Sequence, residues 1–88
     1  MINPVYQQMV YRVGIQNLIP LTSDKNLTFE DLQILANQST TMPDNVGSAI
    51  YFLLNNFKKL SILGDNDVKG ISESDLKAFS QKGLDLIA

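Results

Sequence analysis

The sequence predicts an all-α fold in which two similar helix-loop-helix units pack against each other. Two observations lead to this fold class. Residues 27–32 recur in pattern as residues 71–76, because both segments place an aliphatic residue, a hydroxyl residue, an Asp and a Leu at the same offsets. Each copy follows a polar loop, and each loop follows an apolar segment with helical spacing. Such a pair in one small chain indicates an EF-hand-like arrangement with shortened loops.

The first helix is predicted to start at Asn3, which can cap it, with Pro4 at the first helical position. Its apolar residues recur at helical spacing up to Leu18, and Pro20 is expected to end it. A short polar loop over residues 21–26 follows. This loop contains a single acidic residue, and we expect no metal there.

The second helix is predicted to run from Thr28 to Asn37, followed by a linker that ends in Pro43. A third helix then begins near Asp44 or Asn45, either of which can cap it. Its apolar stripe has the i, i+3, i+4, i+7 spacing of a buried helical face and consists of Val46, Ala49, Ile50, Leu53, Phe57 and Leu60.

Three further apolar residues of the third helix, Tyr51, Phe52 and Leu54, lie outside this stripe. They are the predicted partner-binding residues, because apolar surface beyond one stripe can form a groove for another protein's helix or extended segment. Gly64 is expected to end the third helix. The fourth helix is predicted to open at Ser72 and to run to about residue 82, with a glycine next that suits a C-cap.

Both repeats have capping-box spacing, with Thr28 and Asp31 in the first and Ser72 and Asp75 in the second. Aliphatic residues also stand at the positions of a hydrophobic staple, as the pairs Leu27–Leu32 and Ile71–Leu76. The simplest interpretation of the repeat is therefore two well-formed helix starts. If the units pair, Leu27 and Ile71 should lie side by side as short extended segments.

A sharper interpretation is a calcium-binding loop that starts at Asp65. An EF-hand loop needs oxygen ligands at positions 1, 3, 5, 7, 9 and 12 and Gly at position 6. Asp67 and Gly70 fit positions 3 and 6, but Lys69 stands at position 5 and Leu76 at position 12. The candidate metal ligands are Asp65, Asp67, Glu73 and Asp75. The alternatives are no cofactor, with an acidic turn in solvent, or weakly bound Ca²⁺.

Composition excludes several classes of function. The chain has 88 residues, which predicts a single domain over 1–88 with units at about 3–37 and 44–83. Net charge is −2 with scattered basic residues, so nucleic acid is not an expected partner. Cysteine and histidine are absent, which removes thiolate chemistry, the commonest zinc ligand and the usual general base. We therefore expect no enzyme.

The sequence also bears on location. No stretch approaches the ~18 consecutive apolar residues of a membrane span. The first residues show no basic region followed by an apolar one, so no cleaved signal peptide is expected. We expect the protein to be cytoplasmic at synthesis.

One family resemblance accompanies these patterns. Residues 27–36, 42–43 and 49–56, together with the Gly-Ile-Ser-x-x-Asp-Leu stretch at 70–76, resemble a segment of the nodulation-protein-X-like translocon family. That family belongs to type III secretion in plant-associated bacteria. The resemblance covers roughly residues 27–79 and implies an effector or accessory protein with non-classical, type III export. The chain departs from the family in a shorter second loop and in a lysine where the family has an acid.

These observations leave three functions open. The first is a non-catalytic protein-protein interaction module. The second is a weak calcium-binding EF-hand-like module, and the third is a structural homodimer that covers the apolar excess with a second copy.

Overall fold

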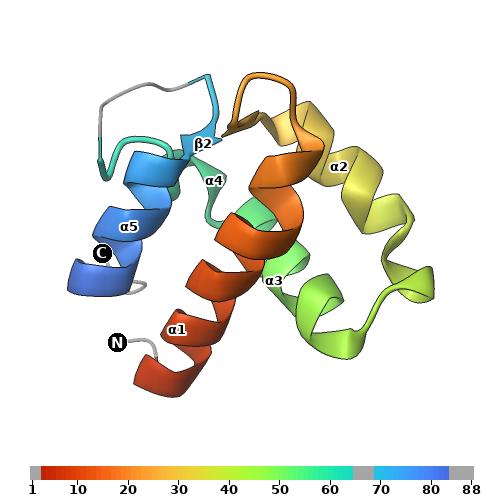
Figure 1. The fold of residues 1–88 in the computed structure, drawn as a ribbon, viewed down its shortest axis with the longest axis horizontal. Helices are drawn as coiled ribbons and strands as arrows, with labels where there is room; N and C mark the ends of the chain where they lie inside the picture. The colour runs from red at the N-terminus through yellow and green to blue at the C-terminus, as the bar shows by residue number, and fades with distance from the viewer. Residues whose placement is uncertain (1–2, 65–68, 84–88) are drawn as a thin grey trace.

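The all-α prediction is confirmed by the computed structural model, which describes residues 3–64 and 69–83 (Figure 1). Helices account for most of this described part, and its strands are two residues long each. In chain order the elements are α1 (Pro4–Val13), the π-helix η1 (Gly14–Leu18), the 3-10 turn η2 (Ile19–Leu21), β1 (Asn26–Leu27), α2 (Phe29–Asn37), the 3-10 turn η3 (Ser39–Thr41), α3 (Asp44–Asn55), α4 (Phe57–Leu60), β2 (Ile71–Ser72) and α5 (Glu73–Lys82).

The first helical segment starts as its sequence predicts. The Oδ1 of Asn3 accepts a hydrogen bond from the Val5 N–H at 2.8 Å, which caps α1. The predicted helical run up to Leu18 is confirmed, although its last five residues form the π-helix η1, and the separate 3-10 turn η2 then includes Pro20. Proline is tolerated there because it stands in the first turn of the 3-10 segment, where its missing N–H would have no partner inside that turn.

The predicted third helix is two helices. Asn56 separates α3 from α4 with φ −117° and ψ 24°, outside the α-helical range. Its side-chain Nδ2 and its backbone N–H both donate to the Phe52 carbonyl, at 2.9 and 3.1 Å. An asparagine side chain that competes for a helical carbonyl favours such interruptions. Neither Asp44 nor Asn45 caps α3, because Pro43 occupies the cap position and no side chain bonds there.

α2 and α5 begin alike, with the capping boxes that their spacing predicts. In the first, the Thr28 Oγ1 accepts from the Asp31 N–H at 3.0 Å, and the Asp31 Oδ2 accepts from the Thr28 N–H at 3.2 Å. In the second, the corresponding distances between Ser72 and Asp75 are 3.2 and 2.9 Å. The staple residues around both boxes are fully buried: Leu27, Leu32, Ile71 and Leu76.

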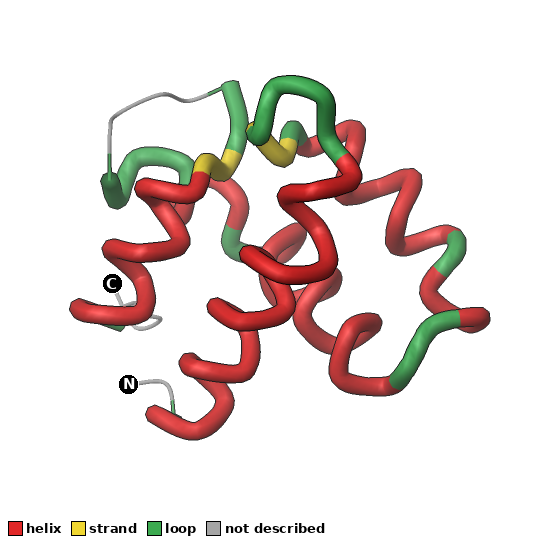
Figure 2. The backbone as a smooth tube through the Cα atoms, in the orientation of Figure 1, coloured by secondary structure: helices red, strands yellow, loops and turns green. Residues whose placement is uncertain are grey.

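The two loops meet at a short antiparallel pairing of β1 with β2 (Figure 2). Leu27 is opposite Ile71, and Asn26 is opposite Ser72. The expectation that Leu27 and Ile71 lie side by side is therefore confirmed. Because both side chains are fully buried, the pairing joins the two halves of the chain over one shared core.

Around that core, α1 crosses the molecule between α5 and α2 and also packs on α3 (Figure 1). A chain of three aromatic rings links these helices. Phe52 of α3 lies 5.6 Å from Tyr6 of α1 and 5.5 Å from Phe79 of α5, measured between ring centroids. The side-chain Nε2 of Gln7 donates to the Phe79 carbonyl at 2.8 Å, which fixes the start of α1 beside the end of α5.

Gly70 lets the two strands approach each other. A Cβ at this position would stand 2.6 Å from Asn26 Oδ1 and 2.8 Å from the Leu27 carbonyl oxygen. The second of these is backbone, which cannot move without opening the pairing. Glycine is needed here for close approach.

We expect Gly70→Ala to lower the free energy of unfolding by about 1–3 kcal/mol, the usual cost of forcing an extra carbon into a tight site. Gly47→Ala on α3 is the matched control, because its Cβ would meet Ser39 Cβ at an ordinary 3.5 Å. Removing a glycine from a helix should stabilise the protein by about 0.5–1 kcal/mol. Urea denaturation followed by circular dichroism measures both. Equal effects of the two substitutions would contradict this account of the loop contact.

Candidate functional site

The predicted calcium ligands do not form a cluster within the described residues. Asp65 and Asp67 lie outside that part of the chain. Glu73 is exposed in the first turn of α5, whereas Asp75 is fully buried. In residues 3–64 and 69–83, no group of three or more acidic, His or Cys residues is placed to hold a metal ion.

The carboxylate of Asp75 is engaged by protein donors. Its Oδ1 accepts from the Gly64 N–H at 2.8 Å. Its Oδ2 accepts from the Ser72 N–H at 2.9 Å and from the Ser72 hydroxyl at 3.1 Å. A buried carboxylate is tolerated only with such partners. Asp75 therefore links the chain after α4 to the first turn of α5.

The three predicted partner-binding residues do not share one side of α3. Phe52 packs inward between Tyr6 and Phe79 and is half-buried. Tyr51 and Leu54 lie on the side of α3 that faces α2, where the Tyr51 hydroxyl is 3.5 Å from the Ala36 carbonyl oxygen. Tyr51 retains 49% of its surface exposed.

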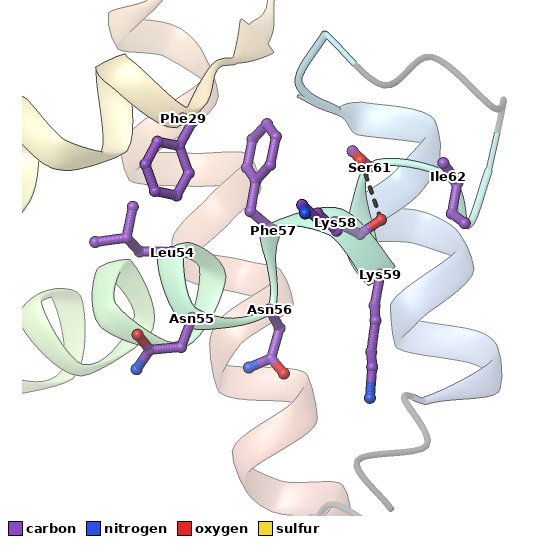
Figure 3. A pocket seen from close by; sticks show the side chains of 9 residues that line it. All are labelled: Phe29, Leu54, Asn55, Asn56, Phe57, Lys58, Lys59, Ser61 and Ile62. Carbon is purple, nitrogen blue, oxygen red and sulfur yellow. Dashed lines mark hydrogen bonds between the residues drawn. The ribbon is translucent and has the colours of Figure 1, made fainter. Parts of the chain in front are cut away.

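Leu54 lines an open groove between the two units, which we call the α2–α4 groove (Figure 3). Its volume is about 900 Å³. The lining comes from α2, the end of α3, α4 and the residues after α4, and comprises Phe29, Leu54, Asn55, Asn56, Phe57, Lys58, Lys59, Ser61 and Ile62. The Ser61 hydroxyl donates to the Lys58 carbonyl at 3.2 Å, which holds the turn that follows α4.

Two phenylalanines meet across this groove. Phe29 begins α2 in the first unit, and Phe57 begins α4 in the second. Their ring centroids are 5.5 Å apart with an interplanar angle of 77°, an edge-to-face contact that aromatic pairs favour. Phe29 is still 45% exposed, and Ile62 at the far side is 48% exposed. The groove thus offers large apolar side chains to solvent.

A second hollow of about 500 Å³ continues the groove between α2 and α3. The two hollows share Leu54, and Ile34 and Tyr51 line the second. We call the combined surface the apolar strip, and it consists of Phe29, Ile34, Tyr51, Leu54, Phe57 and Ile62.

The strip gathers most of the exposed large apolar side chains of the described chain. Six such residues are exposed, and four of them belong to the strip. The other two, Val5 and Leu21, lie on α1 and η2. Scattered exposed apolar residues are ordinary, whereas large contiguous apolar patches are typical of interaction sites in general.

The sequence predicted Tyr51 and Leu54 as partner-binding residues but not the other four residues of the strip. For Phe29, the internal repeat does indicate a surface position. Phe29 aligns with Glu73 in the second copy, so an aromatic ring stands where the equivalent helix start has a charged residue. An apolar residue at a position that its own repeat leaves polar indicates surface rather than core.

The chain matches no protein-family model, and comparisons with curated proteins and with solved structures give no match either. The resemblance to a type III secretion translocon family therefore stays a prediction. Among the helices of the described residues, none has both the length and the apolar character to cross a membrane.

The two capping boxes differ in burial, which gives a paired test. We expect Asp75→Ala to lower the free energy of unfolding by about 2–3 kcal/mol, since it removes a cap, deletes a fully buried side chain and leaves the Gly64 N–H without its acceptor. Asp31→Ala, in the half-buried first box, should cost about 1 kcal/mol. Chemical denaturation of both variants measures the difference. Equal losses would show that the Gly64 link contributes nothing to stability.

The calcium alternative is tested by thermal melting. We expect the same melting temperature in millimolar calcium and in excess chelator, because the Asp75 carboxylate is engaged by Gly64 and Ser72. A ligand at 100 times its dissociation constant would add about 2.7 kcal/mol. In a domain of this size that raises the melting temperature by roughly 10 °C or more. Such a rise, abolished by Asp65→Ala with Asp67→Ala, would establish the calcium-binding alternative.

Proposed function

We propose that this chain is a non-catalytic protein-protein interaction module that binds the apolar face of a partner helix along the apolar strip. One observation supports the proposal: within residues 3–64 and 69–83, four of the six exposed large apolar side chains gather in two adjoining hollows between the units. Burying exposed apolar surface is the main favourable term in association.

The form of the surface favours a helix as the occupant. An amphipathic helix presents anchors at i, i+3, i+4 and i+7, and such anchors fit successive hollows along a groove. The α2–α4 groove and the second hollow adjoin at Leu54, which offers two successive places for anchor side chains. Tyr51 and the aromatic pair Phe29–Phe57 supply the aromatic area in which interface cores are rich.

Two other functions are consistent with the same surface. A second copy of the chain could cover the strip, which would make the protein a structural homodimer. The secretion-associated role implied by the family resemblance is compatible with either occupant, since an effector or accessory protein works through protein partners. Light scattering of the purified chain separates a dimer from a monomer that awaits a partner.

The proposal is tested with a labelled helical peptide that has leucines at i, i+3, i+4 and i+7 and an uncharged polar face. We expect Ile62→Ser and Tyr51→Ser each to weaken its binding about tenfold, because truncating one anchor contact costs about 1.4 kcal/mol. Fluorescence polarisation measures the affinity, and NMR amide shifts should localise the contact to α2, α3 and α4.

Val5→Ser is the matched control, since Val5 is 79% exposed and lies on α1 away from the strip. Its affinity for the peptide should equal that of the unaltered protein. Circular dichroism confirms that each variant is folded. Peptide binding that survives both strip substitutions, or that Val5→Ser weakens equally, would refute the proposed function.

A further inference from the structure

Charge is distributed unevenly along the apolar strip. Lys58 and Lys59 of α4 border the α2–α4 groove, and none of the described residues that line it is acidic. The second hollow is bordered by Glu30, which follows Phe29 in the first turn of α2, and by the amides of Gln33 and Asn37. The strip therefore has two basic residues on α4 and one acidic residue at the start of α2.

Lys58 is the basic residue on which the inference depends. It is exposed, whereas Lys59 is half-buried and extends away from the rings of Phe29 and Phe57 (Figure 3). The hydrogen bond from Ser61 to the Lys58 carbonyl keeps this stretch of backbone in place beside the groove. The backbone from which the Lys58 side chain extends thus has a fixed position relative to the apolar contacts.

We infer that the partner is an amphipathic helix that lies in one direction, with an acidic N-terminal turn over α4 and its C-terminal turn over Glu30. This inference rests on the proposed function and adds the chemistry and the orientation of the partner. Opposite charges at the rim of an interface steer association and set its register. The charges that the partner helix needs at its two ends for this contact are also the charges that stabilise the helix itself.

The inferred direction agrees with the electrostatics of helices in general. Acidic residues are favourable in the first turn of a helix and basic residues in the last, because of the helix macrodipole. A partner with this ordinary charge pattern meets Lys58 with its carboxylates and Glu30 with its lysines. A helix lying the other way would place like charges opposite Lys58 and opposite Glu30.

Two labelled peptides test the direction. They share one apolar face and one composition, and they differ in whether the glutamates are N-terminal and the lysines C-terminal or the reverse. At low salt we expect the first peptide to bind about threefold more tightly or better, the range of a few rim charge pairs. The preference should disappear in 0.5 M salt, since exposed charges are screened.

Lys58→Glu should abolish or reverse the preference between the two peptides. Lys82→Glu is the control, because it makes the same charge change in the last turn of α5, outside the residues that line the strip. If neither peptide binds, the proposed function itself fails. If both bind equally well, the groove function stands and the inferred direction is refuted.

Vesicles of phosphatidylcholine with phosphatidylserine form a further arm, because an apolar surface bordered by lysine can also meet a lipid surface. We expect no sedimentation of the protein with these vesicles. Sedimentation that depends on Lys58, in a protein that does not discriminate between the peptides, would overturn the inference in favour of a membrane surface.

Discussion

The pairing of Leu27 with Ile71 is the contact on which the rest of this bundle depends. Both side chains are fully buried, and each stands directly before the capping box of a helix. The pairing therefore fixes where α2 and α5 start relative to each other. Because Phe29 follows Leu27 by two residues, the same contact also places the first ring of the α2–α4 groove. The surface between the units is thus a consequence of how their loops meet.

The two halves have the same order of helix, loop and helix, but the Asp residues of their capping boxes differ in burial and in hydrogen-bond partners. In the first half, Asp31 is half-buried and bonds within its own box. In the second half, Asp75 is fully buried and also accepts from the Gly64 N–H beyond the box. Burial of a carboxylate is unfavourable in itself, and three donors offset it here. The second box consequently joins two helices, whereas the first only begins one.

Local signals in the sequence were sufficient for most of the fold. Thr28, Ser72 and Asn3 act through atoms within three residues, so helix starts could be predicted from spacing alone. The break at Asn56 and the 3-10 turn at Pro20 were not predicted, although the Asn56 side chain bonds a carbonyl only four residues away. Of the apolar strip, Tyr51 and Leu54 could be predicted from the sequence, because they lie outside the main apolar stripe of their helix.

The groove itself could not be predicted, and the reason is tertiary. Periodicity places a residue on a face of its own helix, but it does not say which helix covers that face. Phe52 and Leu54 look equivalent in sequence and both are half-buried, yet Phe52 packs against α1 and α5 whereas Leu54 lines the groove. Phe29 required the register of the two loops, which only the β1–β2 pairing supplies.

The fixed ends of the second loop have a consequence for engineering. Gly64 is tied to α5 through Asp75, and Gly70 is packed against Asn26 and Leu27. Both anchors are held by the bundle, and joining two fixed points costs only about 0.6 kcal/mol more for each doubling of the number of residues between them. This position is accordingly suited to the insertion of a tag or a reporter sequence while the rest of the molecule keeps its shape.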